Sequence, residues 1–178
     1  DPLATGLLII CTGKFTKKIN EYMAQEKEYT GSFTLGAVTP TYDLESEPQQ
    51  HKTIAAVTAE MIRETTAVFT GEIQQVPPIY SAIKKQGTAL YELARRGVDV
   101  EIEPRKVFIR IFEITAVEMP VVHFRIICST GTYIRSVAHD FGVALGCGAY
   151  LSALRRTRIG EFSVDDAFTI ETFIDTLK

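Results

Sequence analysis

The first six residues place a carboxylate on a short loop whose backbone is restricted. Asp1 is followed by Pro2, which cannot donate a backbone hydrogen bond to a β-ladder, and Gly6 permits a turn. The apolar run at residues 7–11 has the length of a buried strand. Loops held by a rigid scaffold often carry catalytic side chains. Asp1 is therefore a candidate for acid–base or nucleophilic chemistry, although an ordinary turn aspartate would have the same local sequence.

A second candidate is an arginine that follows a glycine turn. Residues 128–135 read CSTGTYIR, in which a strand ends, a turn follows and a helix begins, so Arg135 falls in the first helical turn. A cation at that position opposes the helix dipole. The sequence therefore predicts that Arg135 has a partner. The alternative is a surface arginine whose stem covers the core.

Several aromatic and basic residues are suited to nucleic-acid contacts. Aromatic rings beside cations fit base stacking and phosphate binding. The tyrosines with basic neighbours are Tyr29, Tyr80, Tyr91 and Tyr133. The net charge of −3 argues against a surface coated in positive charge, but the uneven charge distribution permits a basic face. Taken singly, such a tyrosine is more often a packing residue, and a pair of basic residues is more often a solvated surface charge.

The composition argues against several other chemistries. Three cysteines at wide spacing predict no disulfide framework, and the three histidines lack metal-ligand spacing, so we expect no metal site. No glycine pattern for nucleotide binding and no hydrolase nucleophile signature is present, so we expect no cofactor. No apolar run approaches the ~20 residues that span a bilayer. We expect a cytoplasmic protein without a membrane segment.

The elements that must position these residues are mixed strands and helices. Strands are predicted at residues 7–11, 29–35, 106–118, 121–128 and 150–159. Helices are predicted from residue 12 or 13 to about 25, after Thr58, from the cap Thr88 to Gly97, and at 132–145 and 169–177. Residues 37–52 are predicted to form a long loop. Without a regular βαβ repeat, the fold class is α+β, with a mixed, mostly antiparallel sheet flanked by helices.

Six segments in this order resemble the TruB family of tRNA pseudouridine synthases, over residues 1 to about 160. They are DPLATGLL at 1–8, Gly13 with Thr16-Lys17, KEY at 27–29, PIYSAIK at 78–84 with its continuation to Gly97, CSTGTYIR at 128–135, and LGCGA at 145–149 with LRRT at 154–157. The DPLATG segment favours the bacterial tRNA enzyme over the guide-RNA-dependent synthases of archaea and eukaryotes. The family's lysine-containing first motif, the histidine upstream of the catalytic loop and a PUA-like domain are not seen. We therefore expect residues 1–178 to be a catalytic domain that lacks its N-terminal part.

The resemblance implies the isomerisation of uridine 55 in the tRNA T-loop to pseudouridine, without a cofactor. It implies that Asp1 is the catalytic carboxylate, and that Tyr29 and Arg135 complete the catalytic site. Asp1 would either add covalently to the sugar or base, or remove a sugar proton; the sequence leaves both routes open. Tyr29 would stack on the flipped base, and its hydroxyl would serve in proton transfer. The further RNA-binding residues expected are Lys17, Asp43, Lys84, Tyr133 and Arg155.

The expected partner is the T-arm of tRNA, and we expect a monomer without a protein partner. One alternative is a non-catalytic RNA-binding or RNA-folding module with the same fold. Such a module has no need for a carboxylate that faces a phosphate-rich ligand. A second alternative is a hydrolase that uses His139 and Asp140 as an acid–base pair, but neighbouring residues on a helix point in different directions.

Overall fold

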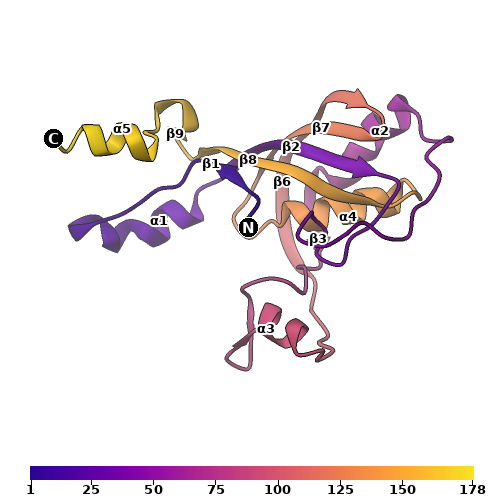
Figure 1. Cartoon of the computed structure of the whole chain (residues 1–178), viewed down its shortest axis with the longest axis horizontal. Coiled ribbons are helices and arrows are strands. Elements are labelled where there is room, and N and C mark those ends of the chain that lie inside the picture. The colour runs from indigo at the N-terminus through magenta and orange to yellow at the C-terminus, as the bar shows by residue number, and fades with distance from the viewer.

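The computed structural model covers residues 1–178 and contains one seven-stranded sheet with helices packed on it (Figure 1). The strand order is β1-β8-β2-β7-β6-β3, with β9 paired to β8. The strands are β1 (Thr5–Gly6), β2 (Lys27–Leu35), β3 (Gly71–Gln75), β6 (Arg105–Glu118), β7 (Val121–Cys128), β8 (Ala149–Ile159) and β9 (Phe162–Ser163). Only β1 and β8 pair in parallel. The predicted α+β class with a mixed, mostly antiparallel sheet is confirmed.

Five α-helices and three 3-10 helices complete the fold, together with a small separate hairpin. The α-helices are α1 (Ile19–Ala24), α2 (Ala59–Thr65), α3 (Leu90–Arg95), α4 (Ile134–Ala144) and α5 (Ile170–Asp175). The 3-10 helices are η1 (Gly13–Lys18), η2 (Thr66–Phe69) and η3 (Val164–Asp166), and the hairpin joins β4 (Lys84–Lys85) to β5 (Thr88–Ala89). No helix is both long and apolar enough to cross a bilayer.

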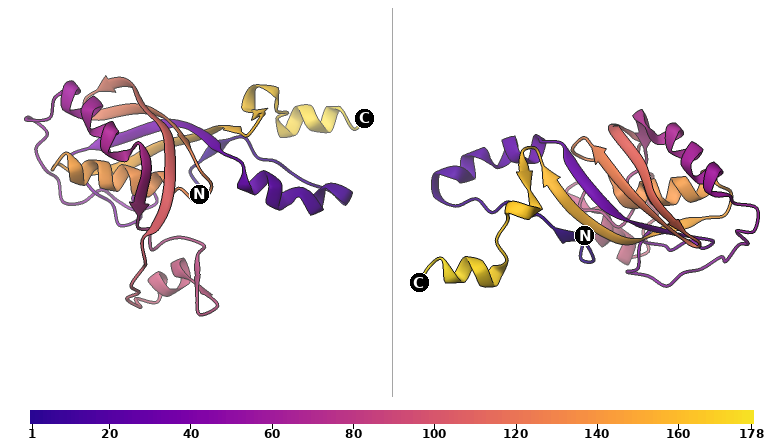
Figure 2. Two further views of the ribbon diagram at one scale, coloured as in Figure 1. Left: turned by 180° about the vertical axis from the view of Figure 1, so that it is seen from behind. Right: turned by 90° about the horizontal axis from the view of Figure 1, so that it is seen from above.

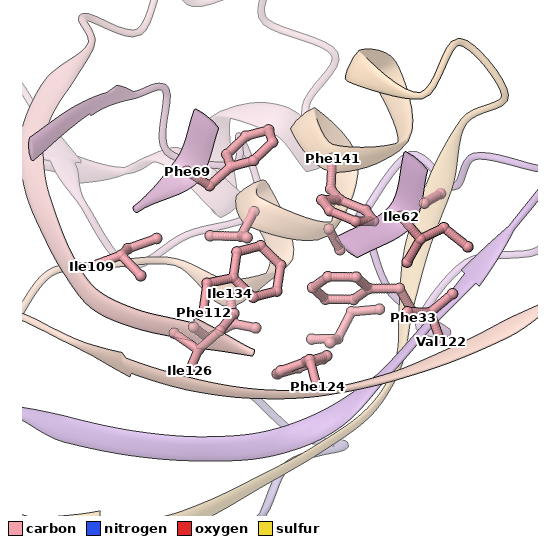
Figure 3. Packing of buried hydrophobic residues seen from close by; sticks show 14 of the residues in the cluster. Phe33, Ile62, Phe69, Ile109, Phe112, Val122, Phe124, Ile126, Ile134 and Phe141 are labelled. Atoms are coloured by element: carbon pink, nitrogen blue, oxygen red, sulfur yellow. The ribbon is translucent and has the colours of Figure 1, made fainter. Parts of the chain in front are cut away.

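The core lies between the sheet and the helices α2 and α4, and phenylalanines dominate it (Figure 3). The rings come from β2, η2, β6, β7 and α4: Phe33, Phe69, Phe112, Phe124 and Phe141. Phe33 stacks on Phe124 with ring centroids 4.3 Å apart, and Phe112 meets Phe141 at 5.5 Å. Aromatic pairs contribute beyond the area they bury. This packing fixes α4, whose N-terminus lies at the candidate site.

Three predicted elements are wrong in detail. Residues 7–11 form no strand: Leu7 is buried, but the chain then leaves the edge of β8, and Leu8 and Ile10 are 70% and 80% exposed. Thr88 does not cap a helix, because it pairs within the β4–β5 hairpin and Ala89 occupies the N-cap of α3. The helix expected from residue 13 is divided into η1 and α1, which bury no side chain. An apolar run in the sequence does not reveal whether another segment of the fold will bury it.

Parts of the chain project from the sheet and give the molecule an extended shape. Helices α1 and α5 lie beyond the same end of the sheet, while α3 and the β4–β5 hairpin form a separate lobe (Figures 1 and 2). The ring of Tyr22 in α1 meets Phe162 of β9 edge-on, with centroids 5.6 Å apart. We call residues 8–24 and 164–178 the arms, and the sheet with α2 and α4 the body.

Candidate active site

Asp1 is held by a short parallel pairing at the edge of the sheet. Thr5 and Gly6 pair with Arg155 and Arg156 of β8, and Leu7 donates its N–H to the Arg156 carbonyl at 2.8 Å. Gly6 has φ = 100°, and a Cβ there would lie 2.2 Å from the same carbonyl oxygen. Only glycine fits this close approach. The predicted rigid loop therefore exists, but two paired residues anchor it in place of the expected strand.

Arg135 is positioned by the N-terminus of α4, which a buried glutamine clamps. Gln75, at the end of β3, accepts the Tyr133 N–H at 2.8 Å and donates to the Tyr133 carbonyl at 3.1 Å. One turn further, Ser136 donates to the Val76 carbonyl at 2.8 Å. Gln75 is 1% exposed, so these bonds act in a dry environment where unpaired groups would be costly. Sequence reasoning missed Gln75, since nothing local marks a glutamine as buried.

The guanidinium of Arg135 joins two carboxylates from distant parts of the chain. Its Nε lies 3.5 Å from Oδ2 of Asp1 and 3.5 Å from Oδ2 of Asp43. Its two terminal nitrogens donate to the carbonyls of Thr41 at 3.3 Å and Tyr80 at 3.0 Å. Arg135 therefore has the partner that its position predicted, and two of its partners are carboxylates.

The two carboxylates differ in access to solvent, which separates their roles. The side chain of Asp43 is 3% exposed and that of Asp1 is 24% exposed. Oδ1 of Asp43 accepts the Glu45 N–H at 3.0 Å, while Oδ2 faces Arg135. Its burial leaves no surface for the direct RNA contact that we expected of Asp43. Asp43 instead holds Arg135, and Asp1 is the carboxylate that a ligand can reach.

Glu45 brings a third carboxylate to this place. Ligand atoms of Asp1, Asp43 and Glu45 all lie within 4.8 Å of one another. Such a group could hold a cation, but the guanidinium of Arg135 already lies within 3.5 Å of two of its members. Arg135 therefore supplies a positive charge to two of the three carboxylates.

A cavity of about 520 Å³ opens on one side of Asp1 and contains the predicted aromatic residue. Asp1, Tyr29, Tyr133, Leu154 and Arg156 are among the residues that line it. Burial raises the pKa of the Tyr29 hydroxyl, and the nearby Arg156 guanidinium opposes that rise in part. Tyr29 therefore remains a neutral phenol near pH 7 and can donate a hydrogen bond or a proton.

A second cavity of about 650 Å³ lies on the other side of Asp1. It shares Asp1, Tyr133 and Arg135 with the first, and adds the aromatic side chains of Tyr80 and Tyr91. Arg95 lies over the Tyr91 ring at 5.5 Å from its centroid. The four tyrosines singled out in the sequence thus line two cavities that meet at the aspartate–arginine pair.

The remaining basic residues fall outside these cavities. Lys17 is exposed on η1, Lys84 is exposed in the β4–β5 hairpin, and Arg155 points outward from β8. Arg156, which the sequence analysis did not choose, lines the first cavity and donates from Nε to the Leu7 carbonyl at 2.8 Å. The alternation of side chains along a strand could have indicated this, because consecutive residues such as Arg155 and Arg156 point to opposite faces of the sheet.

The alternative acid–base pair is not assembled. The ring of His139 stacks on Tyr42, with centroids 4.0 Å apart and planes at 15°, and no hydrogen bond joins it to Asp140. Burial raises the pKa of Asp140 to about 6 and lowers that of His139. The two side chains therefore have separate environments, as their positions on the helix predicted.

Known structures share this sheet and its attached helices. A structure described as "Crystal Structure of a Cbf5-Nop10-Gar1 Complex" aligns with a TM-score of 0.71 at 28% identity, over 98% of this chain and 43% of the other. A second, described as an H/ACA RNP bound to a substrate RNA containing 2'-deoxyuridine, aligns with a TM-score of 0.69 at 27% identity, over 98% and 41%. The fold is that of the pseudouridine synthases.

Sequence comparison narrows this class to one family. Residues 1–134 match the TruB family pseudouridylate synthase (N terminal domain), and residues 135–178 match the tRNA pseudouridylate synthase B C-terminal domain. The chain is 55% identical to tRNA pseudouridine synthase B of Flavobacterium johnsoniae, over 100% of this chain and 78% of the relative. It is 45% identical to that of Parabacteroides distasonis, over 100% and 76%. The chain belongs to the TruB family, whose members isomerise uridine to pseudouridine in tRNA.

Proposed function

We propose that this chain isomerises uridine 55 in the T-loop of tRNA, with Asp1 as the catalytic carboxylate. The observation that carries the proposal is the ion pair between Asp1 and buried Arg135, at 3.5 Å, where two tyrosine-lined cavities meet. A carboxylate beside a phosphate-rich ligand is electrostatically unfavourable, so a protein that only binds RNA gains nothing from one at this position. The guanidinium offsets that cost and fixes the direction of the carboxylate.

The proposed reaction is balanced without a cofactor. The bond between ribose C1′ and uracil N1 breaks, the base rotates, and a bond forms between C1′ and C5. The proton that C5 loses is matched by the proton that N1 gains, so the product is an isomer of the substrate. Asp1 either adds covalently to the sugar or base, or removes a sugar proton, and either route requires an ionised carboxylate.

Tyr29 is proposed to receive the flipped base. Extruding a base from a structured loop costs a few kcal/mol, and stacking on an aromatic ring returns about 1–3 kcal/mol. Tyr29 lies in the same cavity as Asp1, and its raised pKa keeps the hydroxyl protonated. A protonated phenol next to the rotating base is placed to exchange the proton between C5 and N1.

We assign the outer contacts to the tRNA backbone. Lys17, Lys84 and Arg155 are exposed and free to meet phosphates. Tyr133 lines both cavities, and Arg105 lies over its ring at 5.4 Å from the centroid. Phosphate contacts position an RNA without reading its sequence. Recognition of the T-arm by shape would then supply selectivity, in a monomer acting in the cytoplasm.

The test is the variant Asp1→Asn, which keeps the shape of the side chain and removes its charge. We expect pseudouridine in a tRNA transcript, read by carbodiimide primer extension, to be abolished while tRNA binding persists. Asp99→Asn, at an exposed position without a recorded contact, is the matched control and should retain full turnover. Full turnover by Asp1→Asn would reject the catalytic role. A wild-type chain that binds tRNA without product would favour the RNA-binding module.

A further inference from the structure

One face of α4 is joined to the loop at residues 39–46 by two neighbouring contacts. Arg135 and His139 are four residues apart, so they lie on the same side of the helix. Arg135 contacts the Thr41 carbonyl and the Asp43 carboxylate. Between these two loop residues, the ring of Tyr42 stacks on His139. Three consecutive loop residues are thus attached to one helical face, alternately to the arginine and to the histidine.

The backbone of Tyr42 is held in an unfavourable conformation. Its φ is 65°, in the left-handed region that an aromatic residue seldom adopts. Such a conformation is strained and persists only where the surroundings enforce it. Two backbone hydrogen bonds help to hold this conformation. The Tyr42 N–H donates to the Thr39 carbonyl at 3.1 Å, and the Leu151 N–H donates to the Tyr42 carbonyl at 2.9 Å. The stacked ring is the third restraint and the one that reaches α4.

Burying part of His139 is energetically unfavourable for a residue that only packs. Its Nδ1 is buried and makes no hydrogen bond, and burial lowers the pKa of the ring so that it is neutral near pH 7. A buried polar atom without a hydrogen-bond partner destabilises the folded state. With no hydrogen bond to orient it, the imidazole is oriented by stacking on Tyr42 and by its neighbours on the helix.

We propose that the stacked pair of Tyr42 and His139 is a positioning device for the reaction. It fixes the loop against α4 in the conformation that presents the Thr41 carbonyl and the Asp43 carboxylate to Arg135. Those contacts direct the guanidinium toward Asp1. Without the ring, the loop can relax out of the left-handed conformation, and Arg135 loses two of its four partners. The inference rests on the proposed function of Asp1 and Arg135.

The test compares variants that keep the stack with variants that remove it. Tyr42→Asn removes the ring, and asparagine tolerates a positive φ, whereas Tyr42→Phe keeps the ring and removes only the hydroxyl. His139→Ala and His139→Phe form the same pair on the helix. We expect Tyr42→Asn and His139→Ala to lower the single-turnover rate roughly 10- to 100-fold, because small displacements of catalytic groups have effects of that size. The tRNA dissociation constant should change less than about threefold, since binding contacts remain.

The two phenylalanine variants should retain the wild-type rate, and the double variant Tyr42→Asn/His139→Ala should lose no more than either single variant. Leu44→Asn is the control within the same loop, because Leu44 is 48% exposed. It should leave the rate unchanged. Equal losses in Tyr42→Phe and Tyr42→Asn would assign the effect to the hydroxyl and overturn the proposal. If Tyr42→Asn does not fold, the comparison of His139→Ala with His139→Phe tests the proposal in its place.

A second readout does not depend on turnover. The exchange rate of the Arg135 Nε proton is measured by NMR, with the signal assigned by its loss in Arg135→Lys. In Tyr42→Asn this proton should exchange roughly 10-fold faster than in the wild type, because local opening exposes it. Unchanged exchange overturns the proposal, and so does faster exchange with a wild-type rate. A wild-type chain without activity would reject the proposed function, and the exchange measurement would still decide the positioning role.

Discussion

The body and the arms of this protein use the same residue types in opposite ways. Phe33 in the body is fully buried among other rings, whereas Phe173 in an arm is 51% exposed. Arg135 in the body is 8% exposed and contacts two carboxylates and two carbonyls. The side chain of Lys17, in an arm, is exposed and makes no hydrogen bond or ion pair. A side chain with several buried partners is held in one conformation, whereas an exposed side chain without partners can adopt many.

The same difference distinguishes side chains suited to catalysis, which need a fixed geometry, from side chains suited to electrostatic contact with phosphates. A carboxylate that acts in catalysis has to be held to a fraction of an ångström, and the proposed pair of Asp1 and Arg135 is anchored through β8, β3 and the core beneath α4. A phosphate contact needs only charge within reach, which an exposed lysine provides. The predictions below test whether the two regions differ as strongly in energy as they do in burial.

The largest effect is expected from Phe33→Ala. Removing a fully buried phenylalanine leaves a cavity and should lower the free energy of unfolding by about 3–5 kcal/mol. Phe173→Ala, the same change in an arm, should cost less than about 0.5 kcal/mol. Urea unfolding followed by circular dichroism measures both. Equal effects would show that the arms are as well packed as the body.

The second effect concerns Asp140, whose pKa is raised from 3.8 to about 6 by burial. The folded state then binds more protons than the unfolded state between these values. Stability should therefore fall as pH rises from about 4 to 6 and level off above. A unit of pKa difference corresponds to about 1.4 kcal/mol, and partial exposure reduces it. We expect Asp140→Asn to be about 1 kcal/mol more stable than the wild type at pH 7 and equal at pH 3.5, by urea unfolding at each pH.

An arm residue provides the comparison for Asp140. Asp175 in α5 is exposed and paired only with exposed Lys178 at 2.8 Å. Asp175→Asn should change the free energy of unfolding by less than about 0.5 kcal/mol at either pH. A stability gain at pH 7 in Asp175→Asn that matched Asp140→Asn would remove the link between burial and the pH effect.

The smallest effect is expected from Lys17→Ala. We expect unfolding to be unchanged and tRNA affinity to fall a few-fold, with the slope of log affinity against log salt reduced by about 1, since one phosphate contact is lost. Filter binding at several salt concentrations gives that slope. Lys178→Ala, in the other arm, is the control. An unchanged slope in Lys17→Ala would place η1 outside the RNA interface.

The strands that form the body could be predicted because their apolar pattern and their partners agree. Residues 106–118 and 121–128 alternate and are separated by a short turn, and they pair as β6 and β7. The apolar run at 7–11 carried the same kind of signal but found no partner strand, so Leu8 and Ile10 stayed exposed. Periodicity reports the tendency of a segment to be covered, and the rest of the fold decides whether it is.

By itself, the sequence determined the α+β class and the family, because the strand and helix patterns and the order of the motifs can be read along the chain. It also predicted that Asp1, Tyr29 and Arg135 form the site. The tertiary structure alone decided that Asp43 is buried beside Arg135, that Gln75 clamps the start of α4, and that Arg156 faces the cavity. These roles depend on which distant segments the sheet brings together, and no local pattern encodes the distance between residues 1, 43 and 135. The core fixes that distance, since close-packed rings allow α4 only one position on the sheet.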